Sequence, residues 1–127
     1  MKAGRASFRL AGVNREQFPE IPSFKSAPLK LSAEVFNYFI QSTAFAITTE
    51  QSRFTLSGAK FILGDGKAKM VTTDGHRLAY IEKAIDAGDA AMDALIPKKA
   101  LLELVKISRD AGGEVQFGED QNHIYFE

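Results

Sequence analysis

The residues of this chain that could do chemistry stand together at positions 71–80. Threonine, aspartate, glycine, histidine and arginine follow one another there, from Thr73 to Arg77. A histidine could act as general base, the aspartate could orient it, and the threonine could be the nucleophile. A triad is normally assembled from separated elements, because adjacent residues rarely converge on one point. A turn that presents His76 and Arg77 to a binding partner explains the pattern better than catalysis does.

Other kinds of chemical site find little support. The chain has no cysteine, which excludes disulfides, thiolate catalysis and cysteine-based metal sites. The only other histidine is His123, which we expect to pack in the last hairpin, and no two carboxylates stand at ligand spacing beside His76. We therefore expect no metal and no cofactor. Residues 64–67 lack the spacing of a phosphate-binding loop and are typical of a hairpin turn.

The composition is that of one soluble globular domain. The chain has 127 residues, of which 45% are hydrophobic and 25% charged. No apolar run approaches the roughly 18 residues of a membrane span, and no export signal is evident, so we expect a cytoplasmic protein. Lys+Arg and Asp+Glu balance at 16 each, which leaves a local basic face possible.

Periodicity predicts the elements that position residues 71–80. We expect helices at 33–45 and 97–111, and strands at 29–31, 54–63, 67–73, 78–85, 94–96, 114–117 and 123–126. A change of apolar phase near Gly58 suggests a bulge or strong twist. The order is an internal pseudo-repeat of a βαββ unit, which predicts an α+β fold with both helices on one face of antiparallel sheets.

The N-terminal part differs from the rest. Residues 6–10 alternate like a strand, and Pro19 and Pro22 then predict an extended linker whose Phe18, Ile21 and Phe24 pin it to a surface. We expect residues 1–23 to be the last strand of a preceding domain plus a linker. Residues 24–127 are expected to form the compact domain.

The two predicted helices differ in charge. The first buries Val35, Phe36, Phe39, Ile40 and Thr43, and its outer face carries no positive charge. The second buries Ala100, Leu101, Leu104, Val105 and Ser108. Its other side carries four cations within about 100° of one another: Lys98, Lys99, Lys106 and Arg109. Such a stripe is either a solvated surface or a track for phosphates.

Several segments together resemble one known family. They are T-D-G-H-R-L-A at 73–79, R-F-T-L-S-G at 53–58, F-P-E-I-P at 18–22 and I-P-K-K-A at 96–100. The chain resembles the bacterial DNA polymerase III beta subunit, the sliding clamp, over nearly its whole length. The resemblance implies a DNA-clamp fold and places residues 24–127 in the middle of three domains.

The resemblance also implies a function. The family forms a ring-shaped homodimer that encircles duplex DNA, lines its hole with helices and has no catalytic site. It is opened by a clamp loader, and it tethers polymerases through short peptides bound between the middle and last domains. Matching positions give one half of that pocket: Leu56, Thr73, Gly75, His76, Arg77 and Leu78. They also give residues that face DNA: Arg53, Lys98, Lys99, Lys106 and Arg109. This favours the phosphate track over the solvated surface.

Some features depart from the family pattern. The chain ends before the final strand of the middle domain, so we expect the strand at 6–10 to fill the open sheet edge, within the chain or by exchange with a second copy. The first helix lacks the cations often seen on hole-facing helices, which predicts weak DNA affinity, and Thr55 stands where an aromatic residue is common. Two alternatives remain: a standalone clamp-like peptide-binding module without DNA encirclement, and a hydrolase that uses His76.

Overall fold

The computed structural model describes residues 2–9, 11–19, 29–48, 50, 56–86, 91–120 and 123–127. Two helices and nine strands, with two short 3-10 helices, make up this part of the chain. In chain order they are β1 Lys2–Ala3, β2 Ala6–Ser7, η1 Arg15–Gln17, β3 Leu29–Ser32, α1 Ala33–Thr43, η2 Ala44–Ala46, β4 Gly58–Gly64, β5 Lys67–Thr73, β6 Leu78–Ala84, β7 Met92–Pro97, α2 Lys98–Ala111, β8 Glu114–Glu119 and β9 Ile124–Phe126.

The two repeats exchange their first strands. One antiparallel sheet has the order β6-β5-β4-β7 and the other has the order β3-β8-β9. Strand β3 leads into α1 but pairs with β8, while β7 leads into α2 but pairs with β4. Neither repeat can therefore fold alone. The predicted α+β class and pseudo-repeat are confirmed, and the first repeat has three strands after its helix.

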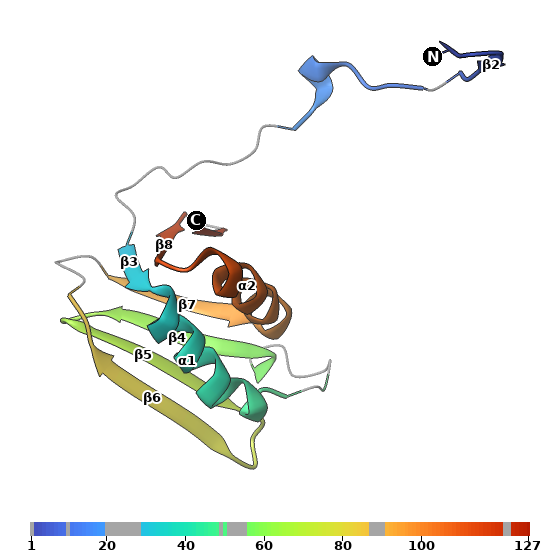
Figure 1. The fold of residues 1–127 in the computed structure, drawn as a ribbon. Coiled ribbons are helices and arrows are strands. Elements are labelled where there is room, and N and C mark those ends of the chain that lie inside the picture. Colours follow the sequence, from blue (N-terminus) through green and yellow to red (C-terminus); the bar gives the residue numbers. More distant parts are fainter. Residues whose placement is uncertain are drawn as a thin grey trace.

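Both helices lie on the same side of the four-stranded sheet (Figure 1). Helix α1 contacts β5 and β6, and α2 contacts α1 and β7. We call this the helix side of the sheet, and the opposite surface the outer face.

The helix ends follow their local sequence. The backbone N–H of Val35 donates to Ser32 Oγ at 3.4 Å, which confirms Ser32 as the cap of α1. The predicted helix 33–45 ends as η2 rather than as α-helix. Pro97 is the last residue of β7 and the cap of α2, so the helix begins one residue later than predicted. It stops at Gly112, whose φ of 61° favours glycine.

Four phenylalanines join the helices to both sheets. Phe36 of α1 lies 5.5 Å from Phe61 of β4 and 5.0 Å from Phe117 of β8, measured between ring centroids. Phe126 of β9 lies 5.5 Å from Phe117. The first three rings are completely buried. This cluster is the centre of the core, because it contacts elements of both repeats.

Strand β4 is shorter than the sequence suggested. The predicted strand 54–63 begins only at Gly58, and Leu56 and Ser57 precede it outside the strand. A Cβ on Gly58 would lie 2.4 Å from the carbonyl oxygen of Ile96. The phase change therefore marks a close approach of β7 to β4, which only glycine permits. At the other end the predicted hairpin to β5 is confirmed, and its loop has two residues, Asp65 (φ 52°) and Gly66 (φ 68°), because Gly64 still pairs with Lys67.

The N-terminal residues form a separate small hairpin. Strands β1 and β2 pair over two residues each, so the predicted strand 6–10 is shorter than expected. In the described part of the chain, β2 pairs with β1 and with no edge of the two larger sheets, so the predicted edge pairing is not formed there. The prediction that Phe18 pins the linker is wrong, since its side chain is 68% exposed. Ile21 and Phe24 lie outside the described residues.

Candidate functional site

Residues 71–80 form the end of β5, a four-residue turn and the start of β6. Thr73 and Leu78 are cross-strand partners, so residues 74–77 make the turn. Thr72 and Ala79 are buried on the helix side. Because successive side chains of a strand alternate, Thr73, Leu78 and Tyr80 lie on the outer face. Leu78 is 65% exposed there and Tyr80 is 53% exposed, so two large side chains of β6 lie on this face within reach of a partner.

Asp74 organises the turn. Its Oδ1 accepts hydrogen bonds from the backbone N–H groups of His76 and Arg77, both at 3.0 Å. These two bonds, together with the Arg77 side chain, lower the pKa of Asp74 from 3.8 to about 2. The Thr73 hydroxyl donates to the Arg77 carbonyl oxygen at 2.7 Å and accepts from the Gly75 N–H at 3.1 Å. The turn is thus held by side chains at both of its ends.

Arg77 joins the turn to η2, the short 3-10 helix that follows α1. Its Nε donates to Asp74 Oδ2 at 2.9 Å, and a terminal nitrogen donates to the Phe45 carbonyl oxygen, also at 2.9 Å. The guanidinium lies 5.4 Å from the centroid of the Phe45 ring. The sequence analysis missed Phe45. Arg77 is therefore an anchor of the turn as well as part of its surface.

The state of Asp74 gives a pH prediction. Its lowered pKa means that it stabilises the fold above pH 3.8, and that this contribution is lost as the pH falls from about 4 towards 2. An NMR titration of the Asp74 carboxyl carbon should have its midpoint near 2. In Arg77→Ala the midpoint should rise but remain below 3.8, because the backbone donors are the larger cause. A midpoint of 3.8 in the unsubstituted protein would contradict this geometry.

A hollow of about 250 Å³ lies on the outer face beside the turn. Leu56 and Thr73 of the predicted pocket line it, together with Val71, Lys60 and Leu95, which the sequence analysis did not include. Gly58 also lines it. Val71, Lys60 and Leu95 could have been found from the alternation of β5, β4 and β7, because it places all three side chains on the outer face.

The other predicted pocket residues do not line the hollow. Leu78 lies next to it, as the cross-strand partner of Thr73. Gly75, His76 and Arg77 belong to the exposed turn at its end. The structure therefore gathers the predicted set into one region, with a hollow on one side and a fixed turn on the other.

The geometry of residues 73–77 does not form a catalytic triad. The Thr73 hydroxyl donates to a carbonyl oxygen, and Asp74 accepts from backbone and guanidinium groups. Among the described residues, the His76 imidazole has no hydrogen bond to either side chain. The base contact that a threonine nucleophile needs is missing.

Within the described part of the chain, no helix is long and apolar enough to cross a membrane.

The predicted basic stripe lies on α2. Lys99, Lys106 and Arg109 are exposed and Lys98 is half-buried, while Leu101 and Ser108 are buried as predicted. Lys106 forms an ion pair with Glu103 at 2.9 Å, which reduces its availability to other anions. Arg53 lies outside the described residues.

Ion pairing differs between the two sides of the sheet. On the outer face, Lys60 pairs with Asp93 at 3.0 Å, and Lys67 and Lys69 approach Glu82 at 2.7 and 3.9 Å. On the helix side, three of the four stripe cations form no ion pair with a described residue: Lys98, Lys99 and Arg109. The helix side therefore has the cations that are available to bind an external anion.

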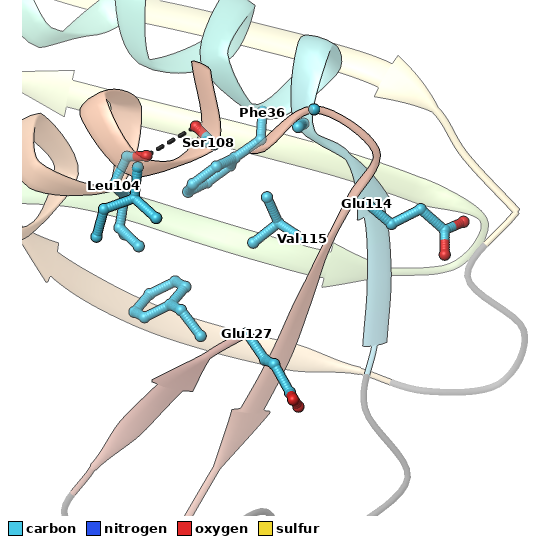
Figure 2. A pocket seen from close by; sticks show the side chains of 10 residues that line it. Phe36, Leu104, Ser108, Glu114, Val115 and Glu127 are labelled. Atoms are coloured by element: carbon cyan, nitrogen blue, oxygen red, sulfur yellow. Dashed lines mark hydrogen bonds between the residues drawn. The ribbon is translucent and has the colours of Figure 1, made fainter. Parts of the chain in front are cut away.

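A second cavity is apolar. It has a volume of about 140 Å³ and lies between α1, α2, β8 and β9. Figure 2 shows Phe36, Leu104 and Val115 around it, with the carboxylates of Glu114 and Glu127 pointing away. The Ser108 hydroxyl donates to the Leu104 carbonyl oxygen at 2.7 Å. This cavity offers hydrophobic contacts and no polar group for chemistry.

Comparisons with known proteins agree with this arrangement. A family model described as DNA polymerase III beta subunit, central domain, matches residues 30–127. The beta sliding clamp of Chlamydia pneumoniae is 35% identical over 127 residues, which cover 98% of this chain and 34% of the relative. That of Staphylococcus epidermidis is 30% identical over 125 residues, covering 98% and 33%. The chain thus spans about a third of the length of these curated relatives.

Solved structures give the same result. The DNA polymerase III beta chain of Streptococcus pneumoniae superposes with a TM-score of 0.80 at 30% identity, over 99% of this chain and 34% of that one. The beta sliding clamp of C. crescentus also gives 0.80 at 30% identity, over 99% and 35%. The resemblance drawn from the sequence and the predicted clamp fold are confirmed. The chain belongs to the DNA polymerase III beta subunit family, and residues 30–127 match its central domain.

Proposed function

We propose that this chain is the middle domain of a sliding clamp, with residues 24–127 forming that domain and residues 1–23 belonging to the preceding one. The full protein would encircle duplex DNA as a ring-shaped homodimer in the cytoplasm and hold the replicative polymerase to its template. Family membership and the names of the relatives support this proposal. It requires neither a catalytic site nor a cofactor.

One observation carries the proposal: the two sides of the sheet have different surfaces. The helix side has cations without ion-pair partners among the described residues, such as Lys99 and Arg109. On the outer face the lysines of β4 and β5 are paired, and an exposed leucine stands beside a hollow. A ring that slides on DNA and carries partners outside needs this division.

The helix side would contact DNA through its phosphates. Phosphate contacts carry no sequence information, which suits a protein that must move along any sequence. Lys98, Lys99 and Arg109 would supply most of the charge, and Lys106 less because Glu103 shares it. Arg53, which precedes β4 in the sequence, would add a further cation. Each contact releases counterions, so binding should weaken steeply as salt increases.

The outer face would bind a short peptide of the polymerase or of the clamp loader. Leu56 and Leu78 would form the floor for an apolar anchor, and Thr73, Gly75, His76 and Arg77 the rim. The hydrogen bonds of Asp74 and the contact of Arg77 with Phe45 hold this rim in place before binding. A fixed rim reduces the entropy lost on association.

Substitution of the floor tests the peptide site. Leu78→Ala should weaken binding of a labelled clamp-binding peptide by about 5–30-fold, since burying a leucine contributes roughly 1–2 kcal/mol more than burying an alanine. Fluorescence anisotropy measures the affinity. Leu102→Ala is the matched control, because Leu102 is 47% exposed on α2, away from the outer face. Equal affinities of the two variants would contradict the assignment of Leu78.

A further inference from the structure

Lys83 of β6 lies on the helix side of the sheet. It is the cross-strand partner of Ala68, which is completely buried under the helices. Ile81, two residues earlier, packs against the core. Because alternate residues of a strand share a face, the Lys83 side chain emerges on the same side as α1. The two lysines of β5 that form ion pairs, Lys67 and Lys69, emerge on the outer face.

A groove runs along the outward surface of α1 between two cations. It has a volume of about 460 Å³, and Lys83 and Arg109 line it together with residues of α1 that include Asn37, Tyr38 and Gln41. These three positions recur on one face of the helix. The α1 surface is thus bordered by β6 on one side and by α2 on the other.

Neither cation of the groove is neutralised by a described residue. Lys83 and Arg109 take part in none of the ion pairs found in the described ranges, whereas Lys60 and Lys67 on the outer face do. One carboxylate, that of Glu34, also lines the groove, and it stands in the first turn of α1. The rest of the α1 surface is neutral.

The neutral residues between the cations can donate hydrogen bonds. Tyr38 is 60% exposed, and Gln41 is exposed. The Ser108 hydroxyl oxygen and Asn37 Oδ1 lie 2.9 Å apart, and this contact joins α1 to α2 next to Arg109. Hydroxyl and amide donors are common partners of phosphate oxygens.

We infer that Lys83 is a further contact to the phosphates of duplex DNA, and that it extends the basic surface of α2 across α1 to β6. This inference rests on the proposed function. An α-helix with its side chains is about 10 Å wide. Cations on its two sides can contact different phosphates of one strand, because duplex DNA repeats its phosphates along its whole length. A continuous polyanion therefore fits this surface better than an isolated carboxylate does.

The sequence predicts weak DNA affinity because the first helix carries no cation, and the proposed contact bears on that prediction. The charge that α1 lacks is supplied by its neighbours, Lys83 from β6 and Arg109 from α2. Helical periodicity could not predict this arrangement, because Lys83 lies on β6 and its position beside α1 follows from strand pairing.

Salt-dependent binding of the purified chain to a fluorescein-labelled duplex tests the inference. In Lys83→Ala the slope of log Kobs against log salt should become shallower by about 0.9, the value for one lost phosphate contact. Lys83→Arg should keep the original slope. Lys67→Ala is the matched control, since it removes one lysine from the outer face and should leave the slope unchanged.

A paired variant separates this inference from the proposed function. If Lys98→Ala/Lys99→Ala makes the slope shallower and Lys83→Ala does not, the inference is overturned while the DNA-facing side stands. If neither variant changes the slope, or if no duplex binding is measurable at low salt, both are overturned. Thermal unfolding of each variant establishes that the fold is retained.

Discussion

Replacing Phe36 with alanine should lower the free energy of unfolding by about 3–5 kcal/mol, the range for a completely buried aromatic residue. Phe36 is 0% exposed and contacts the rings of Phe61, Phe117 and Phe126. Its removal leaves a cavity between α1 and both sheets. The two repeats exchange strands around this point, so we expect the whole described domain to lose stability together. Urea denaturation followed by far-UV circular dichroism gives the free energy.

Phe18→Ala is the matched control for this experiment. The chemical change is identical, but Phe18 is 68% exposed in the N-terminal segment. We expect a change within about 0.5 kcal/mol, as for surface substitutions elsewhere. A loss of less than 1 kcal/mol in Phe36→Ala, or equal losses in the two variants, would mean that the phenylalanine cluster is not the centre of the core.

Much of the fold could be predicted because its signals are local. Alternation fixed the bounds of β5 as Lys67–Thr73, and helical periodicity identified Phe36 and Leu101 as buried. The strand predicted at 54–63 is present but begins later, at Gly58, where the Ile96 carbonyl oxygen of another strand leaves room only for glycine. The exchange of first strands between the sheets likewise depends on pairings that no single segment encodes.

The turn of the candidate site could be predicted from the sequence, but the interactions within it could not. The T-D-G-H-R-L-A segment predicted a turn, and residues 74–77 form one between β5 and β6. Its internal structure depends on which atoms meet: Asp74 binds two backbone N–H groups, and Arg77 reaches Phe45, 32 residues away. The hollow beside the turn also needs Leu95 of β7, whose proximity follows from sheet order rather than from sequence spacing.

The second large expected effect is a change in the salt dependence of duplex binding when the cations of α2 without ion-pair partners are removed. Removing Lys98, Lys99 and Arg109 together should abolish up to three phosphate contacts. The slope of log Kobs against log salt for duplex binding should then become shallower by up to about 2.7, at roughly 0.9 for each contact. None of the three forms an ion pair with a described residue, so the substitutions leave no described carboxylate without its partner.

The matched variant removes the same number of cations from the outer face: Lys60→Ala/Lys67→Ala/Lys69→Ala. It changes the net charge of the chain equally. Those lysines are paired with Asp93 and Glu82, and they lie on the side that we assign to peptide partners. Net charge alone would weaken DNA binding to the same extent in both variants.

The most direct test of the clamp assignment is therefore the difference in salt slope between these two triple variants, measured with one labelled duplex. We predict a much shallower slope for the helix-side variant and an unchanged slope for the outer-face variant. Equal slopes, or a larger change in the outer-face variant, would contradict the assignment of the helix side to DNA.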